Sequence, residues 1–319
     1  MEVFDGHRAL AERPKLPAPA VAIGNFDGVH LGHKALLDDA LAAAAARGGT
    51  SIAYTFDPHP TAVLAPHVAP TLITTRSRKL ELLEAAGIDV VVIEPFTPEL
   101  AALSPSDFVE RVLVGAIGAS HVVVGWDFTF GKGRAGNTVT LAEHGRRAGF
   151  TVSVIDKVLV DGEVASSTRI RNYLRHGDLA GARRLLGHPY DMDGTVVHGA
   201  KRGRALGIPT ANILPDGALQ VPTGIYAARL RALPGPGLPG GAYLDAVASV
   251  GTNPTFVDGG AVTFEVHVLD WDGDLYDRHV RAQLIARLRE ERKYPSADAM
   301  MEQIRDDIRQ AREVLAAER

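Results

Sequence analysis

Between residue 20 and about residue 160, short runs of β-branched residues alternate with stretches that have helical spacing. The predicted strands are AVAIGNF, SIAYTF, DVVVIEPF, HVVVG and TVSVID, and the predicted helices lie near 33–47, 78–86, 106–117 and 140–148. Strands separated by helices are joined by crossovers, so they lie parallel in a sheet that is covered on both faces. The pattern therefore predicts a Rossmann-like, doubly wound α/β domain.

The pattern changes after two short helices expected at 167–175 and 179–186. From about 190 to 275 the strand-like runs DGTVVHG, GIYAARLRAL, AVASVG and VTFEVHVL follow one another without a helix between them. This spacing predicts antiparallel hairpins that close into a small β-barrel. Residues 280–318 are expected to form two amphipathic helices, the second with Ser296 as its N-cap. We therefore expect two domains, 1–186 and 187–319.

Composition excludes several classes of function. Lys and Arg number 34 against 38 Asp and Glu, which gives a formal net charge of -4, and nucleic acid is disfavoured as the main partner. The absence of cysteine excludes disulfides, thiolate metal sites and cysteine nucleophiles. The start of the chain lacks a signal-peptide pattern, and no long apolar run follows it. We expect a cytoplasmic protein that binds small molecules away from membranes, as a monomer or weak homo-oligomer.

The first candidate site begins where the strand AVAIGNF runs into DGVHLGH (27–33) and then a helix. Open α/β sheets bind ligands at the carboxyl ends of their strands, and a helix N-terminus favours phosphate. His30 and His33 are three residues apart, so both can face one anion and stabilise a leaving pyrophosphate. The alternative is a pair of surface histidines at a helix start. No Walker lysine pattern and no third zinc ligand accompany them.

Four segments occur in order, namely GNFDGVHLGH (24–33), TFDPHP (55–60), VVVGWDFTFGKGRAG (122–136) and SSTRIRNYL (166–174). They resemble the motifs of the bacterial bifunctional riboflavin kinase/FMN adenylyltransferases, also called FAD synthetases. The resemblance implies a nucleotidyltransferase in which the FMN phosphate attacks the α-phosphorus of ATP directly. The ATP-binding residues expected in this domain are Gly24, Asn25, Phe26, Asp27, His30, His33, His59, Asp127, Ser167, Thr168 and Arg169.

Several roles in this domain remain open between alternatives. By resemblance, Ser167 and Arg169 hold the β and γ phosphates of ATP. His59 is either a third donor or a structural residue, and Asp127 contacts nucleotide, flavin or metal. Phe56 and Phe128 are predicted to contact the flavin. The alternative for the phenylalanines of the GWDFTFG segment is core packing, which we favour for one of them.

The second candidate site is the segment GAKRGRALG (199–207), with three glycines and three basic side chains in nine residues, followed by PTAN (209–212). Such a loop suits ATP phosphates, and the alternative is a plain Gly-rich turn. Thr210 and Asn212 share one face of an extended chain, and Mg²⁺ accepts their oxygen atoms. On the strand TFEVHV, Glu265 lies opposite the apolar face. It is either a general base or a solvent-facing residue.

PTAN, GIYA (224–227), SVGTNPTF (249–256) and FEVHVLD (264–270) are similar to the riboflavin kinase module of the same family, and the resemblance spans about 20–312. It implies Thr210 and Asn212 as Mg²⁺ ligands and Glu265 as general base, with Asn212 also at the catalytic centre. The remaining expected ATP ligands are Gly199, Lys201, Gly203, Gly207, Thr210 and Asn212. Arg204 and Glu265 are expected to bind flavin.

The expected activity is phosphorylation of riboflavin to FMN by the second domain and adenylylation of FMN to FAD by the first. ATP, riboflavin and FMN are then substrates and Mg²⁺ is the cofactor. Three rival readings remain. These are an enzyme with one active half, a non-catalytic flavin sensor, and an adenylyltransferase for another small molecule.

Overall fold

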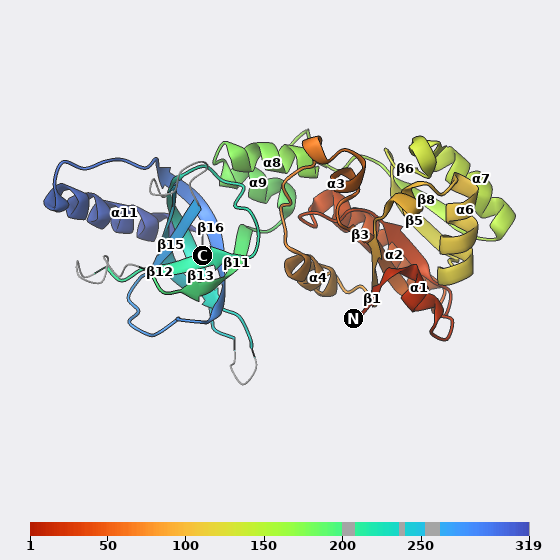
Figure 1. The fold of residues 1–319 in the computed structure, drawn as a ribbon, viewed down its shortest axis with the longest axis horizontal. Helices are drawn as coiled ribbons and strands as arrows, with labels where there is room; N and C mark the ends of the chain where they lie inside the picture. Colours follow the sequence, from red (N-terminus) through yellow and green to blue (C-terminus); the bar gives the residue numbers. More distant parts are fainter. Residues whose placement is uncertain (200–207, 236–239, 253–261, 319) are drawn as a thin grey trace. The chain divides into compact units, whose positions relative to one another are not determined.

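The computed structural model describes residues 1–199, 208–235, 240–252 and 262–318. The chain forms two compact units, Met1–Thr71 with Arg76–Ser166 and Leu72–Thr75 with Ser167–Arg319 (Figure 1). The boundary predicted between residues 186 and 187 remains a prediction. Within the described ranges, no helix combines the length and the apolar character that crossing a membrane requires.

The first unit contains a six-stranded sheet in the order β1-β4-β3-β2-β5-β8, and all its pairs are parallel. The strands are β1 (Glu2–Asp5), β2 (Ala20–Ile23), β3 (Ser51–Asp57), β4 (Val90–Pro95), β5 (His121–Gly125) and β8 (Thr151–Ile155). Five of the six were expected from the alternation of runs, so the doubly wound prediction is confirmed. The short, polar β1 was not expected, and it joins the sheet at its edge beside β4.

Helices cover both faces of this sheet because the strands are apolar on both sides. One face packs against α1 (Gly6–Ala11), the π-helix η2 (Phe108–Ile117) and α7 (Thr138–Ala148). The other packs against α2 (Leu31–Ala46) and α4 (Arg76–Ala85). The shorter elements are α3 (Pro60–Leu64), η1 (Pro66–Val68), α5 (Pro98–Ala101), α6 (Pro105–Asp107), β6 (Thr129–Phe130), η3 (Lys132–Arg134), β7 (Gly136–Asn137), β9 (Leu159–Val160) and β10 (Glu163–Val164).

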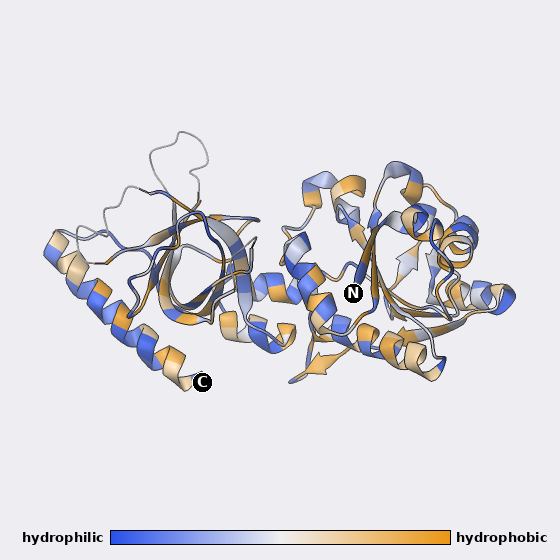
Figure 2. Cartoon of the chain, turned by 90° about the horizontal axis from the view of Figure 1, so that it is seen from below, coloured by the Kyte–Doolittle hydropathy of each residue, from blue (hydrophilic) through white to orange (hydrophobic). Residues whose placement is uncertain are grey.

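The second unit contains a closed antiparallel barrel in the order β11-β12-β15-β14-β13-β16, as predicted (Figure 1). Its strands are β11 (Tyr190–Val197), β12 (Ala211–Pro215), β13 (Gly224–Ala232), β14 (Leu244–Thr252), β15 (Val262–Val268) and β16 (His279–Arg289). The expected helices α8 (Ser167–Arg175) and α9 (Leu179–Leu186) precede it. Helix α11 (Ala297–Ala317) lies along the barrel and alternates polar and apolar residues (Figure 2).

The helix predicted from about residue 280 is wrong, because these residues form β16, which pairs with β11 and β13. Val280, Ala282 and Leu284 share one buried face, and Ile285, which a register shift leaves unpaired with β13, packs against α11 on the other. With both faces covered, apolar residues fall on both, so the two-residue period of a strand is hidden. The second predicted helix is confirmed, since the Ser296 hydroxyl accepts the Ala299 N–H at 3.2 Å.

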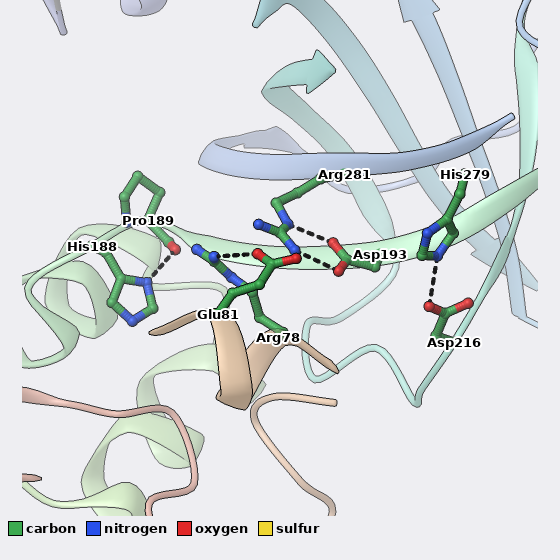
Figure 3. A network of polar contacts seen from close by, with 8 residues as sticks. All are labelled: Arg78, Glu81, His188, Pro189, Asp193, Asp216, His279 and Arg281. Carbon is green, nitrogen blue, oxygen red and sulfur yellow. Dashed lines mark hydrogen bonds and ion pairs between the residues drawn. The ribbon is translucent and has the colours of Figure 1, made fainter. Parts of the chain in front are cut away.

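Arg281 of β16 lies directly opposite Asp193 of β11, and both are almost fully buried. The guanidinium donates from Nε and from Nη2 to the two carboxylate oxygens, each at 2.6 Å (Figure 3). Nearer the surface, His279 and Asp216 lie 2.8 Å apart between Nε2 and Oδ2 (Figure 3). A buried charge is tolerated only when it is paired and hydrogen-bonded. The ion pair between Arg281 and Asp193 therefore ties β16 to β11.

We predict that Asp193→Asn lowers the free energy of unfolding of the second unit by about 3–5 kcal/mol, because the variant lacks the carboxylate that faces the buried Arg281 guanidinium. The measurement is urea unfolding followed by Trp271 fluorescence. It is made in a Trp126→Phe background, so that the second unit alone contains tryptophan.

The matched control is Glu313→Gln, which removes an exposed partner of Arg309 on α11. Exposed pairs contribute at most about 1 kcal/mol, so the unfolding midpoint should barely move. Equal, small losses in Asp193→Asn and Glu313→Gln would contradict the importance of the buried pair.

Candidate active sites

The predicted histidine pair lies at the start of α2, after the carboxyl end of β2. His30 is the N-cap of this helix, and its Nδ1 accepts the backbone N–H of His33 at 3.2 Å. The two rings stack with centroids 3.7 Å apart. Since Nδ1 of His30 is an acceptor, the neutral ring carries its proton on Nε2, which is then a hydrogen-bond donor. The structure brings the two imidazoles together at a helix N-terminus, where an anion is favoured.

The turn before this helix is strained. Phe26 and Val29 have φ values of 47° and 39°, in the left-handed region that residues other than glycine avoid. Burial of the Phe26 ring in the core beneath α2 holds the turn, and Asp27 is buried beside it. Gly24 extends β2 by donating its N–H to Tyr54 O at 3.1 Å.

The carbonyl oxygen of Asn25 is a second anchor of the turn. It accepts the Thr55 hydroxyl at 3.0 Å and Lys79 Nζ at 2.9 Å. Lys79 is nearly buried. Its burial lowers the pKa of the ammonium, and the nearby carboxylates Asp27 and Asp57 oppose that shift. Lys79 was not among the predicted site residues. The available signal was its position four residues before the buried Leu83 on a predicted helix.

Gly32 lies where another part of the first unit approaches α2 closely. A Cβ atom at this position would stand 2.8 Å from the carbonyl oxygen of Ala165 and 3.0 Å from the ring of His30. The third position of H-x-G-H therefore accepts glycine alone without displacement of the backbone or of the histidine.

His59 caps α3 by accepting the Thr61 N–H on Nδ1 at 3.2 Å, so it has a structural role. Its Nε2 lies 3.2 Å from Nδ2 of Asn25, which connects the segment TFDPHP to the turn after β2. The two predicted ATP-binding residues Asn25 and His59 are thus neighbours. Any contact of His59 with nucleotide remains a prediction.

The segment after β5 contains exposed Asp127 and two aromatic rings that stack at 5.5 Å. Phe130 is buried in the core, while Phe128 packs on the same core and stays partly exposed. Phe56 also packs on that core from the end of β3. Phe130 therefore has the core role expected for one of the two rings. Flavin contacts of Phe56 and Phe128 remain predictions.

Ser167, Thr168 and Arg169 form the first turn of α8, as predicted, and Thr168 and Arg169 are exposed. Their contact with ATP phosphates remains a prediction.

A cavity of about 670 Å³ lies in the first unit at the carboxyl ends of β1 and β4. Inside it, His7 donates its backbone N–H to Glu94 Oε2 at 2.7 Å, and its Nδ1 lies 2.8 Å from Oε1. Burial raises the pKa of Glu94, but the hydrogen bonds and charge of His7, together with a hydrogen bond from Tyr54, lower the pKa overall. Sequence reasoning missed this pair, and none of the predicted site residues lines the cavity.

In the second unit, three of the predicted kinase residues converge. Asn212 lies directly opposite Glu265 across β12 and β15, and the Thr210 hydroxyl donates to Glu265 Oε2 at 3.1 Å. Gly199 packs directly on the amide of Asn212 and leaves no space for a side chain. The other predicted residues of this loop, Lys201, Gly203, Arg204 and Gly207, lie outside the described residues.

His267 follows Glu265 on the same face of β15 and was not predicted as a site residue. Its Nδ1 donates to the carbonyl oxygen of Pro209 at 2.8 Å, which holds the chain immediately before Thr210. The hydroxyl, amide and carboxylate oxygens here are the donor types that Mg²⁺ prefers, so the residues fit this cation. Among the described residues, no group of three or more His, Asp or Glu side chains has the arrangement of a metal site.

Comparisons with known proteins find matches for both parts of the chain. The model of the FAD synthetase family matches residues 13–169, and the model of the riboflavin kinase family matches residues 186–315. The bifunctional riboflavin kinase/FMN adenylyltransferase of Pseudomonas fluorescens is 38% identical over 304 residues, or 95% of each chain. The protein chain belongs to this bifunctional family. The enzyme of the same name from Escherichia coli K12 is 36% identical and covers 98% of this chain, with 97% of its own length matched.

A solved structure from Streptococcus pneumoniae, titled a macrolide-efflux protein, has the same fold as this member of the riboflavin kinase/FMN adenylyltransferase family. Its TM-score is 0.82 at 28% identity, with 97% of this chain and 98% of that chain covered.

We predict that Gly32→Ala destabilises the first unit by about 1–3 kcal/mol, because the new methyl group overlaps the Ala165 carbonyl and the His30 ring. The measurement is urea unfolding followed by Trp126 fluorescence in a Trp271→Phe chain. Helix propensity alone acts in the opposite direction and would stabilise the variant by up to about 1 kcal/mol. A stabilised variant would therefore show that the close approach is unimportant.

Proposed function

We propose that this chain phosphorylates riboflavin to FMN in its second unit and adenylylates FMN to FAD in its first. The observation that carries the proposal is the presence of a separate set of reactive groups in each unit. A stacked histidine pair begins α2, and a Thr210, Asn212 and Glu265 cluster lies on the barrel. Neither set shares a residue with the other, so the two reactions are separable.

In the kinase reaction, Glu265 takes the proton from the ribityl 5′-hydroxyl of riboflavin. That oxygen forms a bond to the γ-phosphorus of ATP, while the bond to the leaving ADP oxygen breaks. Thr210 orients the carboxylate through its hydrogen bond to Oε2. Thr210 and Asn212 would hold Mg²⁺, which neutralises phosphate charge when bound. The role of Glu265 as the base is supported by its position on β15, where it lies opposite Asn212 and is hydrogen-bonded to Thr210.

In the adenylyl transfer, an oxygen of the FMN phosphate attacks the α-phosphorus of ATP, and pyrophosphate leaves. His30 and His33 stabilise the charge that grows on the leaving group. The Nε2–H of His30 is the donor, because the helix cap occupies Nδ1. Asn25, Asp27 and Asp127 are proposed to complete the ATP site of the first unit, with Phe56 and Phe128 on the flavin.

Further properties follow from this activity. ATP and flavin substrates favour a cytoplasmic location, and the absence of cysteine accords with a reducing compartment. We propose Mg²⁺ as the cation of both reactions and a monomer or weak homo-oligomer as the working form. The functional boundary between the two activities is placed between residues 186 and 187.

Glu265→Gln should abolish FMN formation from riboflavin and Mg-ATP, with a rate loss of at least about 10²-fold, because a general base is removed. FAD formation from supplied FMN should be unchanged. Flavins are separated by chromatography after each incubation. Glu290→Gln, at an exposed position of the same unit, is the control and should keep both activities. Loss of both activities in folded Glu265→Gln would contradict the division of labour.

His30→Asn, combined with His33→Ala, should lower FAD formation from FMN by at least about 10²-fold and spare FMN formation. Asparagine keeps an acceptor for the helix cap, so the fold is retained while the imidazole donor is lost. The exposed His67→Asn is the control, and it should leave both rates unchanged. A variant with normal FAD formation would exclude the histidines from the reaction.

A further inference from the structure

The turn between β2 and α2 keeps an unfavourable backbone conformation. Phe26 and Val29, with φ values of 47° and 39°, lie in the left-handed region. Residues other than glycine persist in this region only where the surrounding structure fixes them. The turn carries Asn25 and Asp27 and leads into His30, so its conformation decides where these proposed ATP ligands lie.

Lys79 of α4 holds this turn from another element of the first unit. Its Nζ donates to the carbonyl oxygen of Asn25 at 2.9 Å, and the buried hydroxyl of Thr55 on β3 donates to the same oxygen at 3.0 Å. The Asn25 carbonyl is thus fixed by a helix and by a strand. A hydrogen bond from a charged donor is roughly twice as strong as one between neutral groups, so Lys79 is the stronger anchor of the two.

The residue that Lys79 holds also places a side chain in the proposed site. Nδ2 of Asn25 lies 3.2 Å from Nε2 of His59, the N-cap of α3. A shift of the Asn25 carbonyl would therefore move this amide relative to His59, and it would also move the turn that leads to His30. One ammonium thus connects α4 to both histidine-bearing segments of the site.

The ammonium of Lys79 is unfavourable for folding in this position. The residue is 9% exposed, and Leu83 on the same helix is fully buried. Burial lowers the pKa of the ammonium, the charges of Asp27 and Asp57 oppose this shift, and the charge of Arg76 adds to it. Because the net shift is downward, the folded unit holds the charged form less favourably than water does. The presence of a lysine here is therefore explained by the site rather than by stability.

We propose that Lys79 is a positioning residue for FAD formation. Through the Asn25 carbonyl it holds the turn after β2, and with it the Asn25 amide and His30, in the arrangement that stabilises the leaving pyrophosphate. Donors that are fixed before the substrate arrives act on the transition state, so the effect of Lys79 falls on the chemical step rather than on the binding of ATP. This inference rests on the proposed adenylyltransferase activity of the first unit.

The test compares Lys79→Met with Lys79→Arg in the full-length protein. Methionine keeps an unbranched side chain but removes the charge and every donor. The kcat for FAD formation from FMN should therefore fall by about 10- to 150-fold in Lys79→Met, with the KM for ATP within about 3-fold. Lys79→Arg keeps a cationic donor and should recover most of the loss. FMN formation from riboflavin, in the second unit, should be unchanged in both variants.

Urea unfolding separates a positioning role from a structural one. It is followed by Trp126 fluorescence in a Trp271→Phe chain. Lys79→Met removes a charge that the fold disfavours and leaves the Asn25 carbonyl bonded to Thr55, so the midpoint should stay the same or rise. A midpoint that falls together with kcat in Lys79→Met, and recovers together with it in Lys79→Arg, would show a structural role and overturn the proposal.

The matched control is Lys15→Met, which replaces an exposed lysine of the first unit and should leave both rates and the midpoint unchanged. In Lys79→Met, a raised KM for ATP with an unchanged kcat would indicate an electrostatic contribution to binding and would overturn the positioning role. If the unaltered protein converts no FMN to FAD, the proposed function fails, and this inference fails with it. If the unaltered protein forms FAD and Lys79→Met keeps the full kcat, the positioning role alone fails.

Discussion

Strands that are covered on both faces leave polar groups only at strand ends and at paired positions, and both units depend on this constraint. In the sheet, apolar residues of β2, β3, β4 and β5 point alternately to two helical layers. His30 and His33 therefore lie beyond the carboxyl end of β2, and Trp126 lies beyond that of β5. In the barrel, the reactive oxygens lie on β12, β15 and the residue preceding β12. The reactive side chains therefore lie at the ends or edges of the buried strands.

Polar groups that do enter the interior are held by specific partners. Asp193 and Arg281 neutralise one another within the barrel, and the ammonium of Lys79 bonds the carbonyl at the turn after β2. That turn contains two residues in the left-handed region, and core packing of Phe26 offsets the strain. Rigid support of this kind keeps hydrogen-bond donors oriented before a substrate arrives, and such preorganisation is the main source of electrostatic stabilisation in enzymes.

Local patterns predicted much of this arrangement, and long-range contacts account for the rest. The parallel sheet, the barrel, and the convergence of Thr210 with Glu265 followed from strand spacing and motifs. The residues of β16 were predicted to form a helix. One face of this strand points into the barrel and the other packs against α11, so apolar residues occur on both faces. The bond from Lys79 to the Asn25 carbonyl and the His7–Glu94 pair could not be predicted from local patterns. Each depends on residues far away in sequence that only the folded sheet brings together.

His30 holds the backbone of α2 with Nδ1, and Nε2 of the same ring is the donor that we propose for the ligand. This double use has an evolutionary consequence. A replacement with only an oxygen acceptor preserves the helix but loses the ring donor, and a replacement with only a donor loses the helix cap. Selection for folding and selection for turnover therefore act on the same side chain, so few replacements at this position can satisfy both.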